Sequence, residues 1–246
     1  MSMTEEAPLS PDARTLVRSV LVTAATKWEA EPLAKGLGLA PAGASRWSGE
    51  VGGRAVTLLK TGMGAKNTAA ALDAAIVAKD YQLALSAGLC GALQPDVKPG
   101  DVVADPHEVE LELVVPLREA AKTLKLPFHF GRLLHTNVVL GPAAKRTLGA
   151  EHRAAGCDME TQAVRRWAYG TPLAVIGVRA VLDGLDEALP ADAPQGEDAA
   201  SLAAFALSRP AALPGLLRLG WRTGRAMTRL TLLLKAYLED LDRTRS

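Results

Sequence analysis

The chain has 246 residues, of which 48% are hydrophobic and 22% charged, and its formal net charge is +1. This length can bury a large core within one domain, and the near-neutral charge gives no electrostatic basis for binding nucleic acid. Its two cysteines, Cys90 and Cys157, form no CxxC pair, so we expect neither a disulfide framework nor a zinc site. The sequence shows no apolar run of about 18 residues and no secretory signal, so we expect a cytoplasmic protein.

Strand-like and helix-like segments alternate along the chain after a polar lead-in over residues 1–17, which we expect to be flexible. Buried-strand patterns cover residues 19–25, 54–60, 83–86, 101–104, 132–135 and 173–181. Helical patterns cover residues 29–38, 67–79, 117–125, 143–150 and 161–169. Glycine turns are expected at Gly62–Gly64 and Gly88–Gly91. The alternation predicts a three-layer α/β fold, with a central mixed β-sheet flanked by helices.

The catalytic core of this single domain is expected at residues 18–187. A stretch rich in Pro, Asp and Ala over 185–197 predicts a loop or lid. Residues 188–246, the lid loop and C-terminal helices, are assigned to the same domain.

Five short segments occur in an order that resembles the nucleoside phosphorylase and nucleosidase superfamily. They are Val22-Thr-Ala-Ala-Thr-Lys-Trp-Glu29, Thr61-Gly-Met-Gly64, Gly88-Leu-Cys-Gly-Ala-Leu93 with Lys98-Pro-Gly-Asp101, Asp158-Met-Glu160 and Arg179-Ala-Val-Leu-Asp183. The resemblance covers about residues 19–187. It implies a nucleoside phosphorylase-like fold that cleaves the N-glycosidic bond of a purine nucleoside. It also implies no metal or organic cofactor, and a homo-oligomer, because superfamily members commonly pair subunits.

Asp183 ends an apolar run, and the resemblance gives it the role of assisting the departing purine at N7. Cleavage builds negative charge on the purine, which an acid or hydrogen-bond donor stabilises. Burial at the end of a strand raises a carboxyl's pKa and favours the acid form. The alternative is that Asp183 caps a helix N-terminus.

Glu160 matches the superfamily's ribose-binding glutamate, and Met159 would pack on the sugar. A carboxylate accepts hydrogen bonds from both ribose hydroxyls and favours an oxocarbenium-like sugar. Glu160 could instead be an exposed acid at a helix start. The resemblance also places Gly88, Leu89, Val139 and Leu140 in the base and sugar pocket, although the last two are ordinary core residues otherwise.

Glu29 matches the glutamate that activates water in the nucleosidase branch. It could instead be a simple acid in the first turn of a helix, and nearby Glu31 is a competing match. Phosphorolysis needs a cationic pocket, but the Gly-Asp-Pro-x-Arg loop of bacterial purine phosphorylases is absent, and Ser86 and Leu89 stand where that family has Arg and Ser. Water is therefore the expected nucleophile. Inorganic phosphate stays open as a co-substrate, with Lys27 as a substitute contact.

A run without Asp or Glu from residue 209 to 238 predicts a basic amphipathic C-terminal helix. Four arginines recur at four-, three- and four-residue steps, which places them on one face beside Trp221: Arg218, Arg222, Arg225 and Arg229. Such a helix can lie on an anionic membrane, or it can pack on the domain or on a second subunit.

The C-terminal third resembles hopanoid-associated nucleoside phosphorylases. The segments are Asp183-Gly-Leu-Asp-Glu-Ala-Leu-Pro190, Leu207-Ser-Arg-Pro210 and Leu213-Pro-Gly-Leu-Leu-Arg-Leu219. The resemblance implies adenosylhopane as substrate, cleaved to adenine and ribosylhopane (or its 1-phosphate) at the inner face of the membrane. The alternatives are a methylthioadenosine/S-adenosylhomocysteine or futalosine nucleosidase, and a nucleoside-binding module without catalysis.

Overall fold

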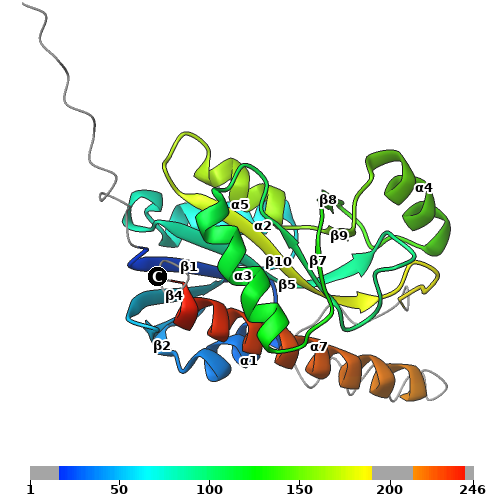
Figure 1. Cartoon of the computed structure of the whole chain (residues 1–246), viewed down its shortest axis with the longest axis horizontal. Helices are drawn as coiled ribbons and strands as arrows, with labels where there is room; N and C mark the ends of the chain where they lie inside the picture. Colours follow the sequence, from blue (N-terminus) through cyan, green and yellow to red (C-terminus); the bar gives the residue numbers. More distant parts are fainter. Residues whose placement is uncertain (1–16, 190–212, 242–246) are drawn as a thin grey trace, which may run out of the picture.

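The computed structural model describes residues 17–189 and 213–241, which build a ten-stranded mixed sheet between two layers of helices (Figure 1). The strands are β1 (Ser19–Ala24), β2 (Ala40–Gly43), β3 (Arg46–Val51), β4 (Arg54–Lys60), β5 (Leu83–Ala92), β6 (Val102–Asp105), β7 (Phe128–Phe130), β8 (Leu133–His135), β9 (Gly156–Asp158) and β10 (Ala174–Asp183). The α-helices are α1 (Lys27–Leu37), α2 (Ala65–Ala75), α3 (Leu111–Thr123), α4 (Pro142–His152), α5 (Thr161–Ala168) and α7 (Leu213–Asp240).

The sheet runs in the order β2-β3-β4-β1-β5-β10-β6-β7, and β9 joins β8 to β5. Strands β4, β1, β5 and β10 are parallel neighbours, while β6 pairs antiparallel with β10. Helices α1, α3 and α7 cover one face, and α2 and α5 cover the other (Figure 1). The predicted three-layer fold is confirmed.

The apolar core lies mainly between the sheet and α7. Leu230, Leu233, Leu234, Tyr237 and Leu238 are fully buried there and follow the spacing expected of one helical face. The Tyr237 hydroxyl donates a hydrogen bond to the Leu113 carbonyl at 2.9 Å, which fixes α7 to α3. Since the C-terminal half of α7 is part of the core, the helix cannot be a detachable appendage.

The carboxyl ends of the four parallel strands meet at one edge of the sheet. This is the edge at which ligands bind in open α/β folds. The segment Ala25–Glu29 follows β1, Thr61–Gly64 follows β4, and Asp183 ends β10. The predicted motifs, which are distant in sequence, are thereby brought together.

The expected glycine turn at Gly88–Gly91 is wrong, because these residues continue β5. They stay paired with β10, from Gly88 opposite Arg179 to Gly91 opposite Asp183. Gly88 has φ +155, and a Cβ built on it would lie 2.4 Å from the Glu29 Oε1 atom and 2.6 Å from the Arg179 Nη1 atom. Glycine is therefore required here for close approach of two side chains and not for reversing the chain.

Several predicted boundaries also differ. Helix α2 ends at Ala75, before the β-branched pair Ile76-Val77, rather than at residue 79. Helix α3 begins at Leu111 and passes through Pro116, because burial of its apolar face outweighs one lost hydrogen bond. The expected lid lies outside the described residues beyond 189.

The turn at Gly62–Gly64 is confirmed, and Gly64 is the N-cap of α2. The predicted C-terminal helix is also present as α7. None of the described helices, α7 included, has a stretch long and apolar enough to cross a bilayer.

Candidate active site

A cavity of about 650 Å³ opens at the carboxyl ends of the parallel strands. Glu29, Glu160 and Asp183 all line it, from three different segments of the chain. Its volume is within the range of about 300–1,000 Å³ that is typical of small-molecule sites. The three predicted carboxylates therefore converge on one space large enough for a nucleoside.

Glu29 is held by backbone and side-chain donors at the end of β1. Its Oε2 atom accepts hydrogen bonds from the Thr26 backbone N–H and hydroxyl, both at 2.9 Å, and its Oε1 atom accepts from the Leu89 N–H at 2.8 Å. The two readings of Glu29 are thus compatible, because this first-turn acid caps α1 and also faces the cavity. Glu31 is exposed and pairs with Lys27, so Glu29 is the residue at the site.

Glu160 is tied to the turn after β4. The Gly64 N–H donates to its Oε1 atom at 2.8 Å, so this helix start binds a carboxylate of the protein itself. Burial raises the pKa of Glu160, while the Arg179 guanidinium and the Gly64 hydrogen bond oppose the rise. A carboxylate offers about four acceptor positions, so Glu160 can still accept hydrogen bonds from a sugar.

Arg179 is a fully buried cation that joins the acidic residues. Its Nη2 atom lies 2.7 Å from the Asp158 Oδ2 atom, and its Nη1 atom lies 3.5 Å from the Glu160 Oε2 atom. Nη2 also donates to the Ser86 hydroxyl at 2.9 Å. Asp158 in turn accepts a hydrogen bond from the N–H of Thr161, the first residue of α5, at 3.0 Å. Arg179 therefore fixes the position from which Glu160 enters the cavity.

Asp183 forms a buried ion pair with Lys145, which comes from α4. Burial raises the pKa of Asp183, and the Lys145 ammonium acts against this rise. The lysine was not found by sequence reasoning, because one lysine in a polar helix gives no pattern. Arg179 did leave a signal, since a charged residue inside the apolar run 173–181 must have buried partners.

The loop after Asp183 is attached to α7. Glu187 accepts hydrogen bonds from Arg222 at 2.8 and 3.2 Å and from the Gly184 N–H at 3.1 Å. The Arg222 guanidinium lowers the pKa of Glu187. Arg229 donates to the Gly100 carbonyl at 2.6 Å. These two arginines thus bind the protein itself, and their predicted membrane-facing position is wrong, because their guanidinium groups are bound to Glu187 and to the Gly100 carbonyl.

The other residues of the predicted membrane face are exposed. Trp221 is 64% exposed, and Arg218 and Arg225 are exposed as well, with the Arg225 guanidinium 5.4 Å from the Trp221 ring centroid. The same stretch of α7 lines the cavity with Leu219, Gly220, Thr223 and Gly224.

The remaining predicted pocket residues divide into two groups. Met159, Leu89, Val139 and Leu140 line the cavity. Gly88 does not, because it is buried behind Glu29 and serves packing. Cys90 and Cys157 also line the cavity, and burial raises the pKa of both thiols, that of Cys157 to about 11.

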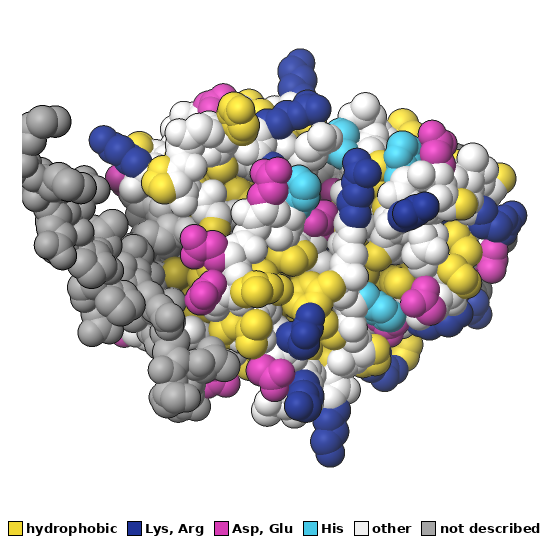
Figure 2. Space-filling model, turned by 45° about the horizontal axis from the view of Figure 1, so that its top comes forward, with side chains coloured by type: hydrophobic (Ala, Val, Ile, Leu, Met, Phe, Trp, Pro, Cys, Tyr) yellow, Lys and Arg dark blue, Asp and Glu magenta, His cyan; other side chains and the backbone are white. Residues whose placement is uncertain are grey.

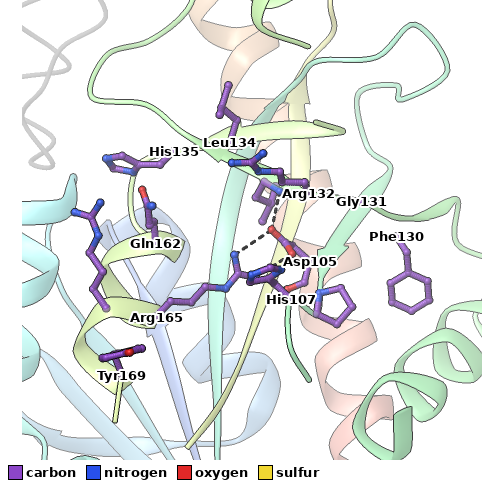
Figure 3. Close-up of a pocket in the computed structure, with 13 residues that line it drawn as sticks. Asp105, His107, Phe130, Gly131, Arg132, Leu134, His135, Gln162, Arg165 and Tyr169 are labelled. Atoms are coloured by element: carbon purple, nitrogen blue, oxygen red, sulfur yellow. Dashed lines mark hydrogen bonds and ion pairs between the residues drawn. The ribbon is translucent and has the colours of Figure 1, made fainter. Parts of the chain in front are cut away.

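A second, more polar hollow of about 1,000 Å³ is lined by a separate set of residues (Figure 3). In it Arg165 from α5 reaches Asp105 at the end of β6, 3.0 Å from its Oδ1 atom. His135, for which the sequence predicts no role, also lines this hollow. None of the predicted catalytic residues lies there. The face shown in Figure 2 mixes basic, acidic and histidine side chains, so it forms no single-sign field for nucleic acid.

The class of fold is that of the nucleoside phosphorylases and nucleosidases. Residues 19–105 match the family described as the phosphorylase superfamily. This segment runs from β1 to β6 and contains Glu29, whereas Glu160 and Asp183 lie beyond it. No curated protein matches the sequence significantly.

Three solved nucleosidase structures have folds similar to that of this chain. The futalosine hydrolase of Helicobacter pylori has a TM-score of 0.66 and 17% identity, over 91% of this chain and 98% of that chain. A mutant of the methylthioadenosine/S-adenosylhomocysteine nucleosidase of the same species, with methylthioadenosine in its active site, has a TM-score of 0.64 and 15% identity over 91% of this chain and 99% of that chain. The corresponding enzyme of Streptococcus pneumoniae, with a transition-state inhibitor, has 0.64 and 18% over 91% and 100%.

Replacement of Gly88 by alanine tests whether the glycine is needed for the arrangement of Glu29 and Arg179. The added Cβ overlaps both side chains, so we expect the free energy of unfolding to fall by about 1–3 kcal/mol. Urea denaturation measures this change. Gly141→Ala is the matched control, because its φ is −78° and no atom lies within 4 Å of its added Cβ. Equal stability of the two variants would contradict the packing role.

Proposed function

We propose that the protein hydrolyses the N-glycosidic bond of an adenosine that carries an apolar group on its 5′ carbon, with adenosylhopane as the favoured substrate. The observation that carries the proposal is a contrast within the cavity lining. Glu29, Glu160 and Asp183 are buried. The exposed and half-buried part of the lining, here called the outer cavity, includes apolar or small residues: Trp28, Pro32, Met63, Val138, Val139, Leu189, Leu219, Gly220 and Gly224.

Each carboxylate has a separate task in this reaction. Glu160 accepts hydrogen bonds from the ribose hydroxyls and stabilises positive charge on the sugar. Asp183 assists departure of adenine, and Glu29 takes a proton from the attacking water. These groups need no metal or organic cofactor.

Water is favoured over phosphate because the cations near the site are already occupied. Lys145 and Arg179 are bound to carboxylates, and Lys27 pairs with Glu31 on the surface. A phosphate dianion needs donors that are available to it. We assign inorganic phosphate no role in the reaction.

The second candidate is a nucleosidase for a small nucleoside, and the similarity of fold to methylthioadenosine and futalosine nucleosidases favours it. The third candidate is a nucleoside-binding module without catalysis. Substrate competition and product release separate the three.

Adenine release is the direct test of the activity. Wild type should release adenine from adenosylhopane in mixed micelles, and the other product should be ribosylhopane, with or without added phosphate. Asp183→Asn should lower kcat by about 10²–10⁴-fold while binding persists, because it removes proton transfer to the purine. Asp186→Asn is the matched control, since Asp186 is an exposed residue of the same loop. Binding without adenine release by wild type would establish the binding module, and a ribosyl 1-phosphate product would establish phosphorolysis.

Two glycines of α7 provide a test of the apolar 5′ group. No atom lies within 4 Å of a Cβ built on Gly220 or Gly224, and both line the outer cavity. Leucine at either position fills that space and also favours the helix. We expect kcat/KM to fall about tenfold or more for adenosylhopane, with methylthioadenosine turnover within about twofold of wild type.

Gly215→Leu is the control for these variants, because Gly215 is on the same helix, has equal space and does not line the cavity. Equal loss for both substrates would argue against the apolar-group assignment. Efficient turnover of methylthioadenosine by wild type, with none of adenosylhopane, would replace it by the second candidate.

We further propose that α7 rests on the inner face of an anionic membrane. Exposed Leu217, Trp221, Arg218 and Arg225 lie on the helix that also lines the outer cavity. This arrangement suits an enzyme that takes the head group of a lipid from the bilayer. It is consistent with a cytoplasmic protein bound peripherally.

Flotation with vesicles that contain anionic lipid tests membrane binding. Each arginine near such a surface contributes about 1 kcal/mol, so the double change Arg218→Gln with Arg225→Gln should weaken binding about thirtyfold. The matched control changes Arg222 and Arg229 to Gln, because both are bound inward, and it should float like wild type. No flotation of wild type, or equal loss in both double variants, would refute membrane docking.

We also propose that the protein forms a homo-oligomer, as the family resemblance implies. Sedimentation equilibrium decides it, since a monomer at assay concentration would contradict subunit pairing.

A further inference from the structure

Lys145 is the one residue of α4 whose charge is buried, with 1% of the side chain exposed. Beyond its ion pair with Asp183, its Nζ atom donates to the Gly184 carbonyl at 2.9 Å and to the Glu187 carbonyl at 2.7 Å. An ammonium has three N–H donors and no acceptor. All three donors are therefore used, and each acceptor belongs to Asp183 or to the loop that follows it.

The contact with Lys145 makes the two carboxyl oxygens of Asp183 different from each other. Lys145 binds the Oδ2 atom, whereas Oδ1 accepts no hydrogen bond from the residues that the structure describes. Asp183 lines the cavity beside Leu182 and Cys157. Since a purine in this cavity approaches the carboxyl group, Oδ1 is the atom available to meet it.

The other titratable groups near the Lys145–Asp183 pair are either paired or neutral, so the pair itself is the source of a transferable proton. Glu187 and Arg222 face it from the loop and α7, and they are paired with each other. Cys157 of β9 and Cys90 of β5 face it from the sheet. Burial raises the pKa of Cys157 to about 11 and also raises that of Cys90, so both thiols stay neutral near pH 8.

We propose that Lys145 is a positioning residue for Asp183 and the source of the proton that Asp183 passes to the departing purine. The proposal rests on the glycosidic cleavage proposed above and adds Lys145 as a second residue that acts together with the acid, Asp183. It departs from the simpler mechanism in which a lone protonated aspartic acid serves the purine. The buried ion pair is the reason, because an adjacent ammonium favours the carboxylate form of Asp183.

Lys145 first passes a proton to the Oδ2 atom of Asp183, which becomes a carboxylic acid, and Lys145 becomes a neutral amine. The carboxyl group then turns about its Cβ–Cγ bond so that the proton faces the purine. As the C1′–N9 bond breaks, its electron pair moves to the purine, N7 takes the proton from Asp183, and Asp183 returns to a carboxylate. Water adds to C1′ and gives its proton to Glu29, and return of that proton to Lys145 through solvent completes the cycle.

The pH dependence of kcat/KM tests the proposal with Lys145→Met. In wild type Lys145 supplies the proton that Asp183 passes on. In the variant Asp183 alone holds the proton, and it loses that proton at lower pH, even though burial raises its pKa. We expect the alkaline fall in kcat/KM to move to lower pH, with a loss of about 100-fold at pH 8 and less than about tenfold at pH 5.5.

Two further variants separate proton supply from simple structure. Lys145→Arg keeps the charge but holds its protons at all accessible pH values, so it should not restore activity. Arg146→Met is the matched control, because Arg146 joins the same helix to Asp186 of the same loop at the surface; its profile should equal that of wild type. A loss in Lys145→Met that is the same at every pH, or rescue by arginine, would overturn the proposal.

Infrared difference spectroscopy gives a measurement that does not depend on turnover. Near neutral pH wild type should show Asp183 as a carboxylate. Lys145→Met should gain a protonated carboxyl band, which is absent when Asp183→Asn is added. A protonated Asp183 in wild type would overturn the proposal even if adenine release were established. Failure of wild type to release adenine from any nucleoside would instead refute the proposed function and leave the infrared result standing.

Discussion

The arrangement of the site depends on the neutralisation of buried acids by two buried cations. Glu29, Asp158, Glu160 and Asp183 are each at most 7% exposed, and such charges are costly to bury without partners. Arg179 is the partner of Asp158 and Glu160, and Lys145 is the partner of Asp183, each cation being 1% exposed. Glu29 is instead held by hydrogen bonds from Thr26 and Leu89. Arg179 comes from the middle of β10 and Asp183 from its end, so one strand positions both halves of the network. The extended backbone of β10 therefore sets the distance between the Arg179 and Asp183 parts of the network.

Helix α7 has two functions along its length. Its C-terminal half fills the core through Leu230, Leu234 and Tyr237, whereas its N-terminal half lines the outer cavity. Arg222 lies within the cavity-lining half and bonds Glu187, whose carbonyl is bound by Lys145. A displacement of α7 at the cavity would therefore also move the loop that follows Asp183. If a membrane or a bulky substrate engages the helix, this chain of contacts connects that event to the acid.

The sequence could predict the layers of the fold, because buried strands such as 173–181 are apolar throughout and helices between them are amphipathic. It could not predict β2, β3, β7 or β9. Strands β2, β7 and β9 have only three or four residues, and β3 is mostly exposed, so none of the four is a run of large apolar residues. Glycines were also ambiguous. The pair Gly62 and Gly64 does make a turn, but Gly88 lies in a strand, and the demand for glycine there comes from Glu29 and Arg179 across the fold. Local patterns do not contain such contacts.

The same limit applies to the site. Order and residue type were sufficient to predict that Glu29, Glu160 and Asp183 share one cavity. Glu29 and Asp183 meet because the ends of parallel strands lie at one edge, whereas Glu160 follows β9, which pairs antiparallel with β5 beside Gly91. They were insufficient for Lys145, whose role depends on how α4 lies over the end of β10. Residue order and type also led to a wrong membrane-facing position for Arg222 and Arg229. Helical spacing puts four arginines on one face, yet spacing alone cannot tell which of them meets an acceptor such as Glu187 or the Gly100 carbonyl.

Electrostatics gives a physical argument on the nucleophile. With all four acids ionised and both cations charged, the groups around the cavity carry a net formal charge of about −2. That field stabilises positive charge on a ribosyl group during bond cleavage. It also opposes entry of a phosphate dianion, since two charges about 4 Å apart repel by about 4 kcal/mol at the effective dielectric of a protein surface. Neutral water meets no such barrier. The excess of buried acids over cations thus favours both halves of a hydrolytic mechanism, the cationic sugar and the uncharged attacking group.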